Sequence, residues 1–354
     1  MSRHRVVPFD DPSLKNTKRR LLETWLKTIA GYLAMGGLIF AALKIVGASY
    51  HFQLGWGLFY IIFPFVSWWF SAKISLMMTK SVPADPNIPE HKRLIDIVHK
   101  TWTKTGLKYE PPVYISDNPL PNAFATGPIH SKAVVAATKG LFLIGLTDQE
   151  IEAVFSHEFG HVYHYDVGIN SFLGMLSSFF FLIVNAGVNA LLGSINIFRR
   201  PFKLKPLRAD RREQYGFIGN IINYVAFYIV FQLTGQLTKL IQMFVVRSRE
   251  SAADAYGAYI TKNPCALATA LEKLVAYVEN HRPQGQQREF WRALRPMMTI
   301  DPLYDAVAEA PKPQTLWQKI RAFYQWLMLT HPTVPDRVHQ LERMNGGACP
   351  KISS

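Results

Sequence analysis

Long stretches without formal charge alternate with amphipathic segments along the chain. Two of the uncharged stretches, residues 28–43 and 45–72, are separated only by Lys44. A helix needs about 20 apolar residues to cross a hydrocarbon core of about 30 Å, so residues 28–72 predict two transmembrane helices, joined near residues 47–53. An aromatic cluster in the second stretch fits either anchoring at the membrane interface or packing in a core: Trp56, Tyr60, Trp68 and Trp69.

Two further uncharged stretches cover residues 167–198 and 214–238. They predict an apolar helical pair within residues 167–246, embedded in the membrane. Two crossings would place the loop between them on the outer side, against the positive-inside trend, whereas no crossing would leave it on anionic cytoplasmic headgroups. The positive residues of this loop are Arg199, Arg200, Lys203, Lys205, Arg208, Arg211 and Arg212.

Residues 73–166 have the pattern of a water-soluble unit. An amphipathic helix is predicted from Pro89 to about Gly106, and a second helix begins at Thr147, whose hydroxyl can form a capping box with Glu150. Short extended runs separated by Pro and Gly predict a small β-sheet between the two helices. These runs are residues 113–116, 122–126 and 133–138.

Residues 247–354 are predicted to form a further part of the protein outside the membrane segments, with several helices. One helix is predicted from Asn263 to about Asn280, and another begins near Pro335. Between them, residues 281–314 are polar and contain prolines, which is typical of a loop or of short helices.

Composition supports a membrane protein. Hydrophobic residues make up 49% of the 354 residues and charged residues only 18%, which excludes a disordered chain. The two cysteines, Cys265 and Cys349, are too few for a disulfide framework. The chain is therefore not a secreted disulfide scaffold, and its cysteine content fits a reducing compartment or indifference to redox conditions.

The net charge of +14 is concentrated in basic segments. Residues 1–27 form a basic N-terminus that precedes a nearly uncharged first loop, which places both ends of the predicted membrane hairpin in the cytoplasm. The basic segments are not interleaved with a nucleic-acid-binding module. We therefore expect anionic lipid headgroups as partners, and no DNA or RNA.

The candidate chemistry lies on the helix that begins at Thr147. The string His157-Glu158-Phe159-Gly160-His161 places two imidazoles four residues apart on one helical face, a spacing at which both reach one tetrahedral zinc ion. Glu158 lies about 100° around the helix, where its carboxylate can act on a water molecule instead of binding the metal. The motif predicts one zinc ion per chain with Glu158 as general base. Without a metal, the two histidines would simply be partly exposed on a helix surface.

A third protein ligand is expected, because catalytic zinc sites combine three protein ligands with one open position. His164 lies about 10 Å along the helix axis from His157, too far for a shared ion, and is interpreted as a surface or supporting histidine. Glu250 is the better candidate. It shares a helical face with Asp254, so one carboxylate can bind the metal while the other orients a zinc-binding histidine. The alternative is an ordinary acidic pair on a helix surface.

Together these motifs resemble the HtpX-like membrane zinc metalloproteases, relatives of the type I CAAX prenyl proteases. The resemblance covers most of the chain: the N-terminal membrane segments, residues 122–127, 157–166 and 249–254, and Thr330-His331-Pro332 with Arg337. It implies that His157, His161 and Glu250 bind zinc and that Glu158 is the general base and acid. It further implies that His331 helps to stabilise the transition state and that Arg337 positions nearby groups. The strand implied to offer its edge to the substrate backbone contains Asn122, Ala123, Phe124 and Ala125.

The resemblance implies an α+β, mainly helical, zincin-type endopeptidase that crosses a cell membrane several times, in bacteria the inner membrane. It favours two membrane segments within residues 167–246 and a catalytic domain, formed by residues 73–166 and 247–354, that faces the cytoplasm. The implied substrates are unfolded or misfolded membrane proteins in quality control.

Two other functions are weighed against this one. Processing of prenylated CAAX peptides would need a large intramembrane chamber, for which about four apolar segments are too few. An inactive scaffold that retains the zinc fold would have no need of Glu158. Cleavage preference and oligomeric state do not follow from the sequence.

Overall fold

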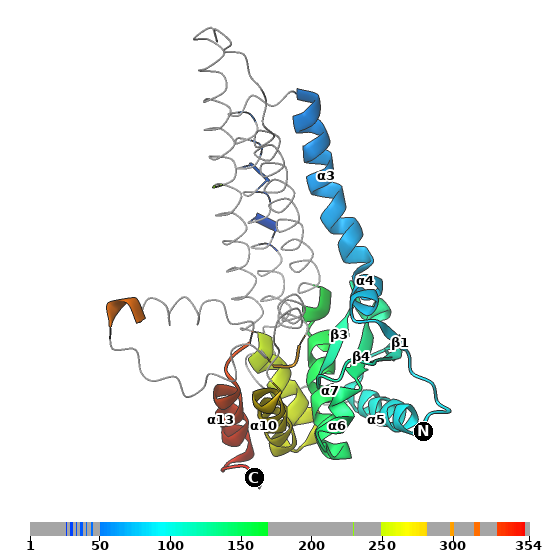
Figure 1. Cartoon of the computed structure of the whole chain (residues 1–354), viewed down its shortest axis with the longest axis vertical. Coiled ribbons are helices and arrows are strands. Elements are labelled where there is room, and N and C mark those ends of the chain that lie inside the picture. Colours follow the sequence, from blue (N-terminus) through cyan, green and yellow to red (C-terminus); the bar gives the residue numbers. More distant parts are fainter. Residues whose placement is uncertain are drawn as a thin grey trace, which may run out of the picture.

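A computed structural model describes residues 50–168, 249–281, 298–300, 315–318 and 331–350, isolated helical positions between residues 26 and 44, and residue 229. These residues are mainly helical and include one four-stranded sheet (Figure 1). The expectation of a mainly helical protein with a small sheet is confirmed. The predicted apolar stretches 28–43, 167–198 and 214–238 lie almost entirely outside the described residues.

The sheet has the strand order β1-β2-β4-β3. Its strands are β1 (Ser81–Pro83), β2 (Val113–Ser116), β3 (Ala123–Thr126) and β4 (Val134–Thr138). β2 and β4 are parallel, whereas β1 is antiparallel to β2 and β3 is antiparallel to β4. Among the described strands, β1 and β3 are therefore the two edges. The three predicted strands are confirmed to within one residue, while β1 is too short to show an alternating pattern.

The register of β3 determines where its peptide groups point. Ala125 stands opposite Val135, whose N–H is donated to Pro112 on the β2 side at 3.2 Å. By contrast, the carbonyl of Asn122 accepts a hydrogen bond from Thr138 of β4 at 2.9 Å. Since bonded and non-bonded pairs alternate along an antiparallel ladder, Ala123 and Ala125 direct their N–H and C=O groups away from β4.

Two helices pack beneath the sheet and against each other. α5 (Pro89–Thr105) begins with proline in its first turn and ends at Gly106, whose φ of +69° suits glycine. α7 (Asp148–Tyr163) begins with the predicted capping box between Thr147 and Glu150. α5 contacts β2 and α7 contacts β3, so the sheet fixes the position of both helices. Their shared core includes Leu94, Val98, Val135, Ile151, Phe155, Phe159, Leu271 and Leu274.

The C-terminal part adds three helical segments. Residues 249–261 are helical, α10 covers Pro264–Asn280 after the N-cap Asn263, and α13 covers Val334–Asn345. α10 packs against both α7 and α13.

The two cysteines form a single disulfide, a pairing that the sequence analysis did not predict. Cys265 at the start of α10 is bonded to Cys349 after α13, with their Cα atoms 5.2 Å apart. The packing of α13 on α10 brings together positions 84 residues apart, and spacing along the chain does not reveal this contact.

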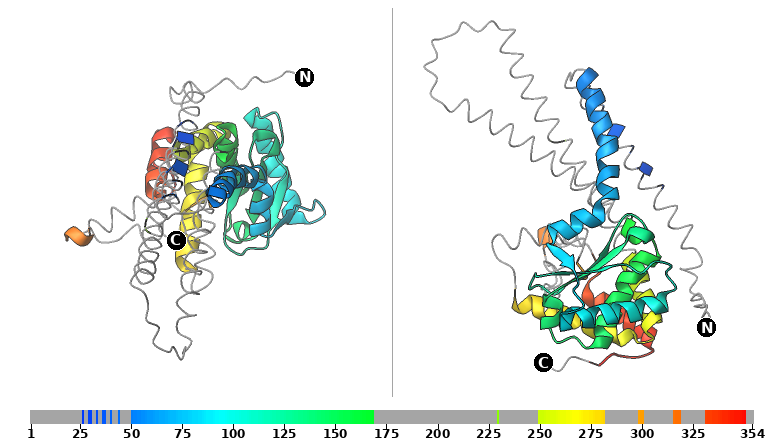
Figure 2. Two further views of the ribbon diagram at one scale, coloured as in Figure 1. Left: turned by 90° about the horizontal axis from the view of Figure 1, so that it is seen from above. Right: turned by 90° about the vertical axis from the view of Figure 1, so that its right-hand side faces the viewer.

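α3 (Tyr50–Trp69) and α4 (Ser71–Met78) connect to the sheet from its other side. α3 extends away from the sheet and its helices (Figures 1 and 2). It begins at Tyr50, inside the segment predicted to join two membrane helices. Within the described residues, no single helix is both long and apolar enough to cross a membrane. The helical segments 53–69 and 71–78 together have the required length and composition, with a bend of 71° between them.

The aromatic residues of α3 do not all share one environment. Tyr60 is buried, and the indole N–H of Trp68 donates to the carbonyl of Gly168 at 3.0 Å, whereas Trp69 is exposed. Within this aromatic cluster, Tyr60 is therefore packed in the fold, whereas Trp69 lies on the surface of α3.

Candidate metal centre

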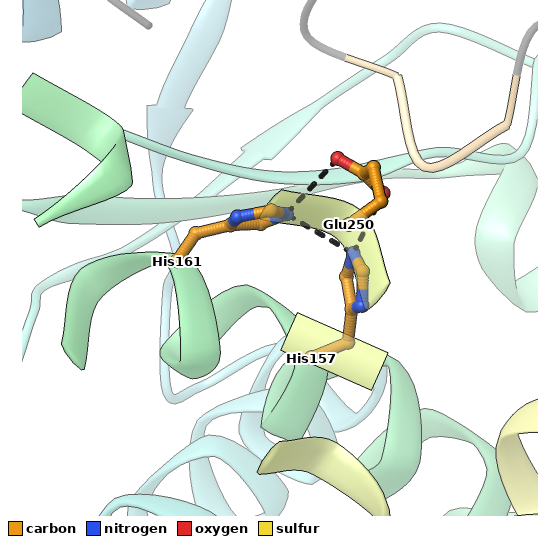
Figure 3. A group of neighbouring side chains, drawn as sticks. All are labelled: His157, His161 and Glu250. Carbon is orange, nitrogen blue, oxygen red and sulfur yellow. Dashed lines mark hydrogen bonds and ion pairs between the residues drawn. The ribbon is translucent and has the colours of Figure 1, made fainter. Parts of the chain in front are cut away.

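α7 carries the two histidines of the site. His157 and His161 lie one turn apart on the same face of this capped, buried helix, and their Nε2 atoms are 3.2 Å apart. Both side chains point to a common space together with Glu250, which comes from the helical segment 249–261 (Figure 3). The Glu250 oxygens lie 3.3 Å from Nε2 of His161 and 3.5 Å from Nε2 of His157.

Two glycines allow the segment 249–261 to approach α7 this closely. A β-carbon on Gly160 would lie 3.0 Å from Cα of Ala253, and one on Gly257 would lie 3.1 Å from the backbone nitrogen of His157. Real β-carbon contacts are rarely so short. The small residues therefore bring Glu250 to the two histidines although 89 positions separate it from His161 (250 − 161).

The three side chains fit a zinc ion. Ligand atoms bound to tetrahedral zinc at about 2.0–2.1 Å lie about 3.3–3.4 Å from one another. The two imidazole nitrogens are 3.2 Å apart, and each lies 3.3 or 3.5 Å from a different oxygen of Glu250. With one ligand atom from each residue, the three atoms lie within 4.8 Å of one another. One oxygen of Glu250 is buried and accepts no hydrogen bond from the described part of the chain. A buried carboxylate with one oxygen beside His157 and the other beside His161 is the arrangement that a cation would complete.

Supporting carboxylates hold the other ring nitrogen of each histidine. Oδ1 of Asp254 lies 2.8 Å from Nδ1 of His157, and Arg337 binds the same carboxylate at 2.7 and 2.9 Å. Burial alone would raise the pKa of Asp254, but Arg337 and His157 together outweigh burial and keep that pKa below its usual value. Oδ2 of Asp166 lies 3.2 Å from Nδ1 of His161 and Asp166 also pairs with Arg249. The sequence analysis identified neither Asp166 nor Arg249 as site residues.

Glu158 contacts the edge strand β3. Its Oε2 accepts a hydrogen bond of 2.9 Å from the N–H of Ala125 in β3. The side chain is buried, and burial raises the pKa of its carboxyl group. The Glu250 carboxyl group differs from that of Glu158. Burial would raise its pKa too, but His331, His161 and His157 hold the pKa well below the usual value. The pKa values of these two neighbouring carboxyl groups are thus shifted in opposite directions.

The residues expected at the C-terminal end also reach the site. Nε2 of His331 lies 3.6 Å from Glu250, and a nitrogen of Arg337 lies 3.7 Å from the same carboxylate. Both side chains are buried. α13 therefore brings Arg337 to the centre, and His331 precedes that helix.

The predicted substrate strand corresponds to β3 and the residue before it. The side chain of Phe124 is buried in the fold, while the outward N–H of Ala125 is donated to Glu158. The side-chain oxygen of Asn122 accepts a hydrogen bond of 2.9 Å from the N–H of Thr299. Nothing in the sequence pattern marks Thr299, which reaches this strand only through the fold.

His164 is not a surface residue. It ends α7, is buried, and lies edge-on to the ring of Tyr256 at a centroid distance of 5.6 Å. Burial lowers its pKa to about 4. It remains outside the cluster of His157, His161 and Glu250.

Comparison with known proteins agrees with this centre. Residues 89–345 match peptidase family M48. "Protease HtpX homolog" of Tropheryma whipplei (strain TW08/27) is 32% identical over 331 residues, covering 92% of this chain and 96% of the relative. The protein of the same name from Persephonella marina is 29% identical over 321 residues, covering 90% and 96%. The crystal structure of S. mikatae Ste24p is a more distant match, with 17% identity, a TM-score of 0.40, and coverage of 91% of this chain and 67% of that one. The family match over most of the chain, together with the relative at 32% identity, shows that the protein belongs to peptidase family M48.

Proposed function

We propose that this protein is a membrane-bound, zinc-dependent endopeptidase that acts on unfolded or misfolded segments of membrane proteins. The observation that carries the proposal is the buried group formed by His157, His161 and Glu250, with Glu158 beside it on the same helix. This donor set is the one that holds a catalytic zinc ion with an open position.

The roles of the side chains follow from their positions. Zinc, when bound, supplies a Lewis acid and an open position for a water nucleophile. Glu158 takes a proton from the water and returns it to the leaving amine, a task that its raised pKa favours. The role assigned to His331, whose Nε2 lies 3.6 Å from Glu250, is to donate a hydrogen bond to the oxygen of the attacked carbonyl. Asp254, held by Arg337, orients His157.

Recognition of the substrate is assigned to the edge of β3. An extended polypeptide that adds to this edge is held mainly by main-chain hydrogen bonds, which read an extended backbone more than a fixed sequence. Such recognition suits unfolded segments, and it is supported by the register of β3, in which the peptide groups of Ala123 and Ala125 point away from β4.

Attachment to a membrane is supported by α3. This 20-residue helix carries no Asp, Glu, Lys or Arg, and many of its large apolar side chains are exposed. They include Leu54, Leu58, Ile61, Ile62, Phe65 and Val66. Apolar exposure of this extent is stable in contact with lipid. We propose several membrane crossings, a cytoplasmic catalytic domain, and basic segments on anionic headgroups.

Zinc content and cleavage of casein by the purified full-length protein test the proposal, with Glu158→Gln as the decisive variant. The variant should keep about one zinc per chain and lose at least about 100-fold in cleavage rate, since a general base contributes about 10²–10⁴. Glu279→Gln on the exposed end of α10 is the matched control and should cleave normally. Near-normal cleavage by Glu158→Gln would contradict the proposed mechanism. Cleavage by the wild type that is unaffected by a chelator would contradict it as well.

Tagging positions around Lys203 with membrane-impermeant reagents tests the topology. Modification from the outer side supports two crossings within residues 167–246. Modification only from the cytoplasmic side excludes them.

A further inference from the structure

A short segment of the chain itself lies along the outer edge of β3. Met298, Thr299 and Ile300 are all buried, with exposed fractions of 7%, 3% and 2%. Thr299 contacts the strand at Asn122 and Ala123, on the side where β3 has no neighbouring strand among the described residues. This is the edge to which the proposed function assigns the substrate.

The main-chain N–H and C=O of Thr299 are both bound by side chains near the metal centre. Its N–H donates to the side-chain oxygen of Asn122 at 2.9 Å, and its C=O accepts from Arg337 at 2.7 Å. Arg337 also holds Asp254, which contacts His157. The peptide unit of Thr299 is therefore clamped between the substrate strand and the guanidinium beside the metal ligands.

The Thr299 hydroxyl also satisfies the outward groups of β3. Its Oγ1 donates to the C=O of Ala123 at 2.9 Å and lies 3.4 Å from the N–H of the same residue. At the next outward residue, the N–H of Ala125 is donated to Glu158. An added strand needs these outward groups for its own main-chain hydrogen bonds. The chain thus occupies the positions that such a strand would use.

We propose that residues 298–300 act as an internal pseudosubstrate, which an extended polypeptide must displace before it can pair with β3. The inference rests on the proposed function and adds a means of self-inhibition to it. The ligand that replaces the segment is an extended peptide whose N–H is accepted by Asn122 and whose C=O is bound by Arg337.

Displacement has a defined kinetic signature. When only a fraction of molecules is open to the ligand, the apparent dissociation constant is the intrinsic constant divided by that fraction. Weakening the contact of residues 298–300 therefore lowers KM and leaves kcat unchanged. If Thr299 instead only supported β3 and Arg337, its loss would lower kcat or raise KM.

Thr299→Val tests the inference, because it removes the hydroxyl bridge to Ala123 and nearly preserves volume. With a casein-derived peptide, KM should fall about three- to tenfold, the effect of one neutral hydrogen bond, at unchanged kcat and zinc content. Thr101→Val is the matched control: Thr101 is equally buried, but its hydroxyl donates within α5, at 2.7 Å to Ile97. An unchanged or raised KM, or a fall in kcat, in Thr299→Val would overturn the inference.

Hydrogen exchange gives a second readout that does not depend on Thr299→Val folding. In the Glu158→Gln variant of the full chain, saturation with the same peptide should make the amide of Thr299 exchange at least about tenfold faster. Unchanged protection of this amide, while fluorescence anisotropy shows the peptide bound, would contradict displacement. Absence of chelator-sensitive cleavage in both wild type and Thr299→Val would instead refute the proposed endopeptidase, and the inference with it.

Discussion

Asp254 and His157 form a buried contact of 2.8 Å between a carboxylate oxygen and Nδ1, and this contact sets the direction of the opposite ring nitrogen. Because Asp254 is held in turn by Arg337 of α13, the C-terminal helix helps to orient a side chain of α7. The metal centre therefore depends on three helical segments that are far apart in the sequence.

Asp254→Asn should weaken zinc binding by about 10–100-fold, as is usual when a group that orients a metal-binding histidine is lost. The substitution removes the negative charge between His157 and Arg337. Competition with a chromophoric chelator measures the affinity. Asp96→Asn, on the exposed face of α5, is the control and should bind zinc as the wild type does. Equal zinc affinity in both variants would show that Asp254 does not orient His157.

Gly257→Ala should separate the segment 249–261 from α7, because the added methyl group would lie 3.1 Å from the backbone of His157. We expect a loss of about 1–3 kcal/mol in stability, typical of overpacking, together with weaker zinc binding. Thermal unfolding in detergent measures the first and chelator competition the second. Gly55→Ala in α3 is the helical control, since nothing lies within 4 Å of its β-carbon. A Gly257→Ala protein as stable as this control would argue against close helix packing.

Glu152 of α7 should contribute a pH-dependent part of stability. Burial alone would raise the pKa of Glu152, but hydrogen bonds from Lys104 and Lys100 outweigh it, so its pKa in the folded protein is below the usual 4.5. A depressed carboxyl pKa stabilises the fold above the unfolded-state value, and this contribution is lost as the pH falls through the folded-state value.

Glu152→Gln should therefore be less stable than the wild type by about 1 kcal/mol at pH 7, since both lysines are partly exposed. The difference should persist down to about pH 5 and shrink below it. Thermal unfolding across this range measures it. A difference that grows toward acid pH would reverse the assigned sign.

The disulfide between Cys265 and Cys349 should stabilise the packing of α13 on α10. Because the bond closes a long loop, with 84 positions between the cysteines, its removal by a Cys265→Ser and Cys349→Ser double substitution should cost about 2–5 kcal/mol. A reductant should lower the unfolding temperature of the wild type and leave that of the double variant unchanged. Equal responses of the two proteins to reductant would show that the cysteines are not paired.

Local signals in the sequence predicted much of the catalytic part. The capping box of Thr147 and Glu150 locates the start of α7, and Pro or Gly residues separate the strands, so these elements are confirmed nearly to the residue. The grouping of Glu250 with His157 and His161 could also be predicted, because ligand type and helical spacing restrict the choices.

Contacts between distant segments could not be predicted in this way. Thr299 lies in a region without periodicity, and its bonds to Asn122 and Arg337 arise only when residues 298–300 meet β3. The pairing of Asp166 with Arg249 likewise depends on the packing of two segments separated by a long apolar insertion. Of the two interpretations of His164, the surface one is wrong, because spacing along α7 shows its distance from His157 but not what packs over it.

Zinc X-ray absorption spectroscopy on the purified full-length protein, compared with Glu250→Ala, tests the central claim most directly. The wild type should bind one zinc per chain through two imidazole nitrogens and a carboxylate oxygen, and Glu250→Ala should lose that oxygen and much of the affinity. A coordination shell and zinc affinity that do not change in Glu250→Ala would contradict the account, as would a wild-type protein that binds no zinc.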